Sequence, residues 1–98
     1  MTVEIKKNGT ELTVVAEGKL DSMTSPGFLE KLLEHMEGVK TLVLDFEKLE
    51  YISSAGLRVL VNVVHRLGED GQLVIRNLND TVRDVFEITG LADGFDVE

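Results

Sequence analysis

Residues 41–46 read TLVLDF, an almost unbroken apolar run of strand length. Runs of this kind are typical of a central strand that is buried on both faces of a sheet. A second apolar run, QLVIRN, occupies residues 72–77. Between and after these runs, apolar residues recur at helical spacing, so strand and helix patterns alternate. This alternation predicts an α/β domain in which parallel strands are joined by right-handed helical crossovers.

The start of the chain departs from this alternation. VEIK and ELTVVAEG flank the dipeptide Asn8-Gly9. Asn-Gly supplies the positive φ angles that a tight hairpin turn demands. We therefore predict two antiparallel strands, over residues 2–7 and 11–18, which make the sheet a mixed one that opens with a hairpin.

Two helical patterns precede residue 70. In the first, Ser25 is a good N-cap, Pro26 fits the first helical position and Gly38 is placed to end the helix. The second pattern predicts a helix over residues 55–68, with Leu57 and its apolar neighbours on the buried side.

The last part of the chain predicts one more helix and an edge strand. Asn79 or Asp80 caps this third helix, and Gly90 ends it. Residues 94–98 add a short strand. The predicted element order is therefore ββαβαβα(β).

Composition limits the classes of function. A chain of 98 residues fits a single domain over residues 1–98. Its net charge of −8 argues against nucleic acid, because an acidic chain gains nothing from releasing the counterions of phosphates. No apolar run approaches the roughly 20 residues that cross a bilayer, and the N-terminus lacks the apolar core of a signal peptide. With no cysteine in the chain, these features predict a cytoplasmic protein that contacts neither nucleic acid nor membrane.

Residues that could carry enzymatic chemistry are sparse. The Gly-x-Ser-x-Gly elbow of serine hydrolases is missing. A base would have to be His35 or His65, and His65 lies roughly 16 Å along a helix from Ser54. The acidic residues and histidines show no zinc or calcium spacing, and the glycines form no phosphate loop. We therefore expect no enzyme, no metal site and no cofactor.

The stretch YISSAGLR, residues 51–58, places Ser53 and Ser54 at the start of the second predicted helix. A serine at the N-cap satisfies a free backbone donor and is worth about 1 kcal/mol. A phosphate is also well placed there, because the free amide groups and the helix dipole favour negative charge. The connections 18–25 and 47–56 both follow strands and precede helices, so we expect them to meet at the carboxyl edge of the sheet.

Three segments match one family pattern in order and at the expected spacing. They are Gly18, Leu20, Asp21 and Thr24 after the second strand, LVLDFEKLEYISSAGLRVL in the middle, and Val82, Phe86, Gly90, Leu91, Phe95 and Val97 at the end. Through these residues nearly the whole chain resembles the STAS domain, specifically the small stand-alone anti-sigma factor antagonists of bacteria. The resemblance implies the STAS fold, an α/β mixed sheet covered by helices.

The resemblance also implies a switch site. The switch motif of the family reads roughly D-S-S/T-G-L-G/R, which puts Ser54 at the phosphorylated serine and Ser53 at the aspartate. The implied partner-binding residues are Asp21, Thr24, Ser53, Ser54, Ala55, Gly56 and Arg58. Two positions depart from the pattern. Arg58 stands where glycine is commoner, and Ser53 removes a carboxylate that could orient the switch hydroxyl.

The function implied by the resemblance is partner switching. The unphosphorylated antagonist binds an anti-sigma factor, a serine kinase of the GHKL type, and so frees a sigma factor. Phosphorylation at Ser54 releases the complex, and a phosphatase resets it. The alternative is a STAS scaffold subunit of a multiprotein signalling or lipid-transport assembly, without phosphorylation. In either case we expect a binding protein, and a monomer when the chain is free.

Overall fold

The computed structural model describes residues 1–89 and 96–97. In chain order the elements are β1 (Thr2–Asn8), β2 (Glu11–Leu20), α1 (Ser25–Glu34), β3 (Thr41–Asp45), β4 (Leu49–Ile52), α2 (Ser54–Leu67), β5 (Gln72–Arg76), α3 (Asp80–Thr89) and β6 (Asp96–Val97). The opening hairpin and the later alternation of strands with helices are both present, so the predicted fold class is confirmed.

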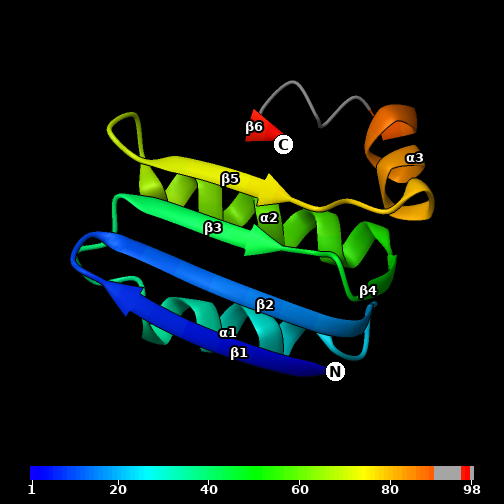
Figure 1. Cartoon of the computed structure of the whole chain (residues 1–98), viewed down its shortest axis with the longest axis horizontal. Helices are drawn as coiled ribbons and strands as arrows, with labels where there is room; N and C mark the ends of the chain where they lie inside the picture. Colours follow the sequence, from blue (N-terminus) through cyan, green and yellow to red (C-terminus); the bar gives the residue numbers. More distant parts are fainter. Residues whose placement is uncertain (90–95, 98) are drawn as a thin grey trace.

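The strands form one mixed sheet in the order β1-β2-β3-β5-β6, and β4 pairs with β2 beyond the end of β3 (Figure 1). β1 and β2 are antiparallel, and the other neighbouring pairs are parallel. The register places Ile5, Val14, Leu44 and Ile75 in one row across four strands. Because side chains alternate between faces along a strand, this row faces the same side of the sheet.

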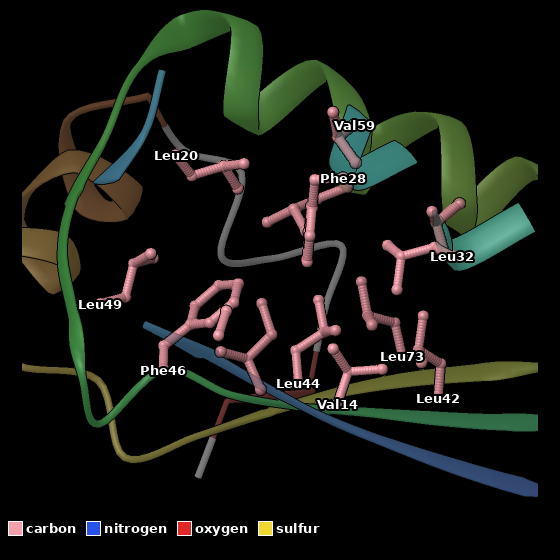
Figure 2. Close-up of a cluster of buried hydrophobic side chains, with 14 of the residues drawn as sticks. Val14, Leu20, Phe28, Leu32, Leu42, Leu44, Phe46, Leu49, Val59 and Leu73 are labelled. Atoms are coloured by element: carbon pink, nitrogen blue, oxygen red, sulfur yellow. The ribbon is translucent and has the colours of Figure 1, made fainter. Parts of the chain in front are cut away.

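Helices α1 and α2 lie together on one face of the sheet, whereas α3 lies at one end, near β4 (Figure 1). The core fills the space between the two helices and the sheet, where Phe28, Val59, Leu44 and Phe46 point toward one another (Figure 2). Each of these side chains is buried. Removing this apolar surface from water stabilises the fold by roughly 25 cal/mol per Å².

The central strand β3 is buried on both faces, as its unbroken apolar run predicts. Leu42 and Leu44 face the helices, and Val43 faces the opposite side with only 2% of its surface exposed. The register places Val43 beside Thr13 of β2 and Val74 of β5. Neighbouring strands therefore enclose Val43 from both sides, although α1 and α2 cover only the other face.

β4 is the element that the sequence did not predict. Its residues, LEYI, fall inside the connection 47–56, which the sequence indicated as a polar loop. Phe46 accepts a hydrogen bond from the amide of Leu49, and this turn returns the chain alongside β2. Four residues with the pattern buried, exposed, exposed, buried are too short to show the period of a strand.

The first helix begins one residue before its predicted start. Thr24 occupies the N-cap position, so Ser25 is the first helical residue and the prediction of Ser25 as N-cap is wrong. The hydroxyl of Ser25 instead donates to the carbonyl of Asp21 and is buried. This local hydrogen bond replaces the cap that the residue type suggested.

The predicted end of the first helix at Gly38 is also wrong. The helix ends at Glu34, and the amide of Val39 donates to the carbonyl of Met36 in a turn. Gly38 has a φ of +75°, which a glycine adopts without steric penalty. The turn brings Met36 and Val39 into the core. Their burial depends on contacts with other segments, which the periodicity of the helix does not reveal.

The other predicted boundaries lie close to the observed ones. Helix α2 covers Ser54–Leu67, and Gly68 follows it with a φ of +74°. Asn79 is the residue that caps α3, because its side-chain oxygen accepts from the amide of Val82 at 2.9 Å. The predicted end of α3 at Gly90 lies outside the described residues. Within those residues, no helix has the length and apolar character needed to span a bilayer.

Candidate functional site

The two polar connections meet at one end of the sheet, as the sequence predicts. The amide of Ser53 donates to the carbonyl of Leu20 at 2.9 Å, which joins the start of α2 to the end of β2. Gly56 lies directly above this contact. A Cβ atom at Gly56 would come within 2.9 Å of the Leu20 carbonyl oxygen and 2.7 Å of a side-chain carbon of Ile52. The absence of a side chain at Gly56 therefore allows α2 to approach the sheet this closely.

The two adjacent serines differ in their surroundings. Ser53 is the N-cap of α2, and its hydroxyl accepts from the amide of Gly56 at 3.4 Å. Its carbonyl accepts from the amide of Leu57 at 3.0 Å. Ser54 is the first residue of the helix, and it is exposed. Ser53 thus supports the helix start, whereas Ser54 presents its hydroxyl to solvent.

The first turn of α2 contains no acidic side chain, while its last turn contains His65 and Arg66. The free amides of a helix N-terminus carry a partial positive charge, which a negative group stabilises by about 0.3–1 kcal/mol at an exposed position. An anionic group attached to Ser54 would therefore lie beside free donors. Arg58 follows Ser54 by four residues, so the two side chains lie on the same face of the helix.

The loop between β2 and α1 is held by reciprocal hydrogen bonds. Oδ1 of Asp21 accepts from the amides of Met23 and Thr24, at 2.9 and 3.1 Å. The hydroxyl of Thr24 accepts from the amide of Asp21 at 2.9 Å and donates to the carbonyl of Lys19 at 2.8 Å. The loop backbone is therefore fixed by its own side chains rather than by a partner.

These hydrogen bonds also change the acidity of Asp21. The backbone amides of Thr24 and then Met23 lower the pKa of the Asp21 carboxyl below its usual value, and nearby Lys19 acts in the same direction. A carboxylate that accepts backbone hydrogen bonds is stabilised in its charged form. Asp21 thus remains a fixed negative charge at this end of the molecule well below neutral pH.

A groove of about 320 Å³ runs between the starts of α1 and α2. Its lining combines apolar side chains with a polar rim and consists of Ser22, Ser25, Pro26, Leu29, Ala55, Arg58, Val59 and Asn62. Ala55 and Arg58 are sequence-predicted site residues, and Ser22 comes from the Asp21–Thr24 loop. Of these lining residues, the sequence indicated only Ala55 and Arg58, because groove walls depend on which helix faces meet.

The seven residues predicted for partner binding therefore divide into three that face outward and four that support the backbone. Ser54 and Arg58 are exposed and Ala55 is half-buried in the groove wall. Asp21, Thr24 and Ser53 hold the backbone through the hydrogen bonds given above. Gly56 is buried and allows the close approach of α2. The structure thus gathers all seven at one end of the molecule, although only part of the set faces outward.

Neither histidine of the chain lies near Ser54. His65 lies in the last turn of α2, at the other end of the helix from Ser54. His35 caps the far end of α1, where its Nδ1 atom lies 2.8 Å from the carbonyl oxygen of Lys31. Among residues 1–89 and 96–97, no group of histidine and acidic side chains is arranged to hold a metal ion. What the site offers is an exposed hydroxyl beside a groove.

Comparison with known proteins identifies the family of this chain and similar proteins. A family model for the STAS domain matches residues 2–98. BtrV of Bordetella bronchiseptica is 35% identical over 99 residues, which cover 99% of this chain and 85% of that protein. The anti-sigma-B factor antagonist of Bacillus subtilis is 30% identical over 98 residues, which cover 99% of this chain and 90% of that protein.

Solved structures share the fold at lower identity. The anti-sigma factor antagonist SpoIIAA in its unphosphorylated form superposes with a TM-score of 0.78 at 19% identity, over 99% of this chain and 87% of that chain. The phosphorylated form of SpoIIAA from Bacillus gives a TM-score of 0.75 at 20% identity, over 99% and 91% of the two chains. At these identities the likeness concerns the architecture of the sheet and helices.

Proposed function

This chain belongs to the STAS domain family, and on that premise we propose that it is an anti-sigma factor antagonist whose binding is switched by phosphorylation of Ser54. Its proposed partner is an anti-sigma factor that is also a serine kinase of the GHKL type. A phosphatase would return the chain to its binding form. In this proposal the chain is a binding protein, as the anti-sigma factor antagonists of this family are, and it is also the substrate of the kinase.

The observation that carries this proposal is the position of Ser54. The residue is exposed, begins a helix whose first turn lacks acidic side chains, and adjoins the groove at Ala55. A kinase can reach such a hydroxyl without unfolding the chain. A phosphate would add about −1.5 to −2 charges beside free amides, which leaves the helix intact while it changes the surface.

Release of the partner follows from electrostatics. A phosphate on Ser54 in a closed interface must lose its hydration, and Asp21 already places a fixed negative charge on the adjoining loop. The phosphate also lies one helical turn from Arg58, so it competes for a cation that an acidic group of the partner could otherwise bind. A loss of roughly 3–4 kcal/mol from these effects would weaken affinity several hundredfold.

Similar proteins support the antagonist function in this proposal. The similar protein from Bacillus subtilis is an anti-sigma-B factor antagonist. SpoIIAA, which shares the fold, is an anti-sigma factor antagonist with a phosphorylated form. The proposed surface comprises the outward-facing residues Ser54, Ala55 and Arg58, held in place by Asp21, Thr24, Ser53 and Gly56.

The test uses the purified chain, ATP and each GHKL-type serine kinase of the same organism in turn. We expect one kinase to bind the chain and to place a single phosphate on Ser54, located by mass spectrometry. The phosphorylated chain should bind that kinase several hundredfold more weakly, measured by calorimetry. Ser54→Ala should bind normally and stay bound when ATP is added, because it cannot accept the phosphate.

Ser22→Ala is the matched control, since Ser22 is also exposed and lines the same groove. This variant should be phosphorylated and released like the parent chain. If a kinase binds but Ser54 receives no phosphate, or if phosphorylation leaves affinity unchanged, the switch is refuted and the unphosphorylated scaffold subunit becomes the better reading. If no kinase binds, the antagonist function itself is refuted.

A further inference from the structure

Strand β1 forms one edge of the described sheet. It is seven residues long and pairs only with β2, and no described strand lies beyond it in Figure 1. An edge strand of this length presents a row of amides and carbonyls with which another strand can pair. The residues that carry these groups follow from the turn that joins β1 to β2.

This turn fixes which backbone groups of β1 point outward. Asn8 is paired with Glu11 across a two-residue turn that begins at Gly9, whose φ is +62°. The two residues that close such a turn exchange backbone hydrogen bonds, and bonded and non-bonded pairs then alternate along the two strands. Counted back from Asn8, every second residue therefore bonds to β2. The amides and carbonyls that point away from β2 belong to Val3, Ile5 and Lys7.

The core is also open at this edge. Val3 and Ile5 lie opposite buried residues of β2, so their side chains face the core, yet each remains half-buried. A hollow of about 290 Å³ between β1 and α1 borders Val3 and Phe28. A strand added beyond β1 would cover apolar surface that the chain leaves partly exposed to water, which favours its binding.

The charged residues of β1 leave this edge free on the core side. Nζ of Lys7 donates to the carbonyl of Glu37 at 2.8 Å, so its charge lies against the turn after α1. Glu4 and Lys6 alternate with the core-facing residues, and they project from the opposite face of the sheet, where both are exposed.

The order of these charges selects one register for a second copy of β1. Antiparallel pairing about a two-fold axis at Ile5 aligns the whole strand with itself, and it sets Val3 of each copy opposite Lys7 of the other. It also sets Glu4 of each copy opposite Lys6 of the other, so two pairs of unlike charges form. Axes at Glu4 or at Lys6 also bring outward-pointing backbone groups together, but they place two carboxylates or two ammonium groups directly opposite.

We propose that this chain forms a homodimer in which the β1 strands of two copies pair antiparallel, with Ile5 on the two-fold axis. The sheet then continues from one copy into the other. The occupant of the edge is a second copy because Glu4 and Lys6 complement their own reversed order. The pairing needs neither a kinase nor a phosphate, so it is independent of the proposed switch at Ser54.

Sedimentation velocity, measured over a range of concentrations, tests the dimer. The parent chain should change from monomer to dimer as its concentration rises. Glu4→Lys and Lys6→Glu each place like charges opposite one another at two symmetric positions, so each should raise the dimer Kd roughly tenfold or more. The double variant with both substitutions restores both unlike pairs, and its Kd should return to within about threefold of the parent value.

Glu69→Lys is the control, because Glu69 is exposed in the turn after α2 and this variant changes the net charge by the same amount as Glu4→Lys. It should leave the dimer Kd unchanged. Circular dichroism of each variant distinguishes a lost dimer from an unfolded chain.

Cysteine variants locate the axis. The chain contains no cysteine, and residues that form a hydrogen-bonded antiparallel pair have Cα atoms about 5.5 Å apart, within reach of a disulfide. Ile5→Cys should therefore link two copies when diamide is added as the oxidant. Val3→Cys should not, because Val3 lies opposite Lys7 and the two Val3 positions are roughly 14 Å apart along the strands.

If the parent chain stays monomeric at its highest soluble concentration, the dimer is refuted. If a dimer forms that Glu4→Lys leaves intact, or that the double variant does not regain, the copies meet at another surface and the proposal is also overturned. Faster linking of Val3→Cys than of Ile5→Cys would overturn the register on which the proposal depends.

Discussion

Gly56 lies where the end of β2, strand β4 and the start of α2 approach one another. A Cβ atom there would meet two side chains and, at 2.9 Å, the carbonyl oxygen of Leu20. This oxygen already accepts from the amide of Ser53, so it cannot move without loss of the hydrogen bond that joins the two loops. One residue without a side chain therefore permits the geometry of the whole site.

Gly56→Ala should lower the free energy of unfolding by roughly 1–3 kcal/mol, because overpacking outweighs the better helix propensity of alanine. Urea denaturation followed by circular dichroism measures this change. Gly27→Ala is the matched control, since Gly27 also lies in a helix and a Cβ there meets nothing within 4 Å. It should raise stability by up to about 1 kcal/mol. Equal stability of the Gly56 variant and the parent chain would contradict the close approach.

Helix α2 begins with two adjacent serines that have different surroundings. Ser53 caps the helix from outside its first turn, and Ser54 is the first residue within it. The sequence showed two serines and a helix start, and the family resemblance distinguished their positions. The structure adds that the hydroxyl of Ser53 is engaged by the amide of Gly56 and that Ser54 is exposed.

Ser53→Ala should therefore lower the free energy of unfolding by roughly 0.5–1 kcal/mol, because the amide of Gly56 loses its cap. Ser53→Asp should retain stability, since an aspartate caps a helix and also suits the positive N-terminus. Ser54→Ala should change stability by less than about 0.5 kcal/mol. The measurement is the urea midpoint of the three variants. A larger loss for Ser54→Ala than for Ser53→Ala would reverse the two roles.

The sheet has a protected central strand, β3, an exposed edge strand, β1, and an exposed end that carries Ser54. Among the described strands, β3 is paired with β2 on one side and β5 on the other, whereas β1 lies at the edge and pairs only with β2. The exposed charged residues Glu4, Lys6 and Lys7 lie on this edge strand, and charged side chains discourage pairing with a second chain in any register that opposes like charges. The proposed switch at Ser54 lies at the end of the sheet, so a partner bound there would leave β1 and β3 undisturbed.

Hydrogen exchange followed by NMR should show this difference. In the monomeric chain, the amides of β3 should exchange at rates set by global unfolding, and those of β1 should exchange faster through local opening. When the kinase is added to the unphosphorylated chain, the amides of the loop between β2 and α1 should exchange more slowly. The exchange rates of the β1 amides should not change. Protection of β1 equal to that of β3 in the monomeric chain would contradict an open edge.

Local patterns in the sequence determined much of this protein. The Asn8-Gly9 turn, the apolar run of β3 and the periodic apolar residues of α2 act over a few neighbouring positions, so they predicted the hairpin, the central strand and the switch helix. The family resemblance, which also depends on short motifs, led to Ser54 and its neighbours. These features need only the chemistry of adjacent residues and the geometry of one element.

Tertiary structure alone decided the rest. β4 forms because β2 extends beyond β3 and offers unpaired backbone groups at Gly18–Leu20, to which LEYI can bond. α1 ends early because Met36 and Val39 gain burial in the core. Each outcome depends on segments that are distant in sequence, and no local period or propensity carries that information.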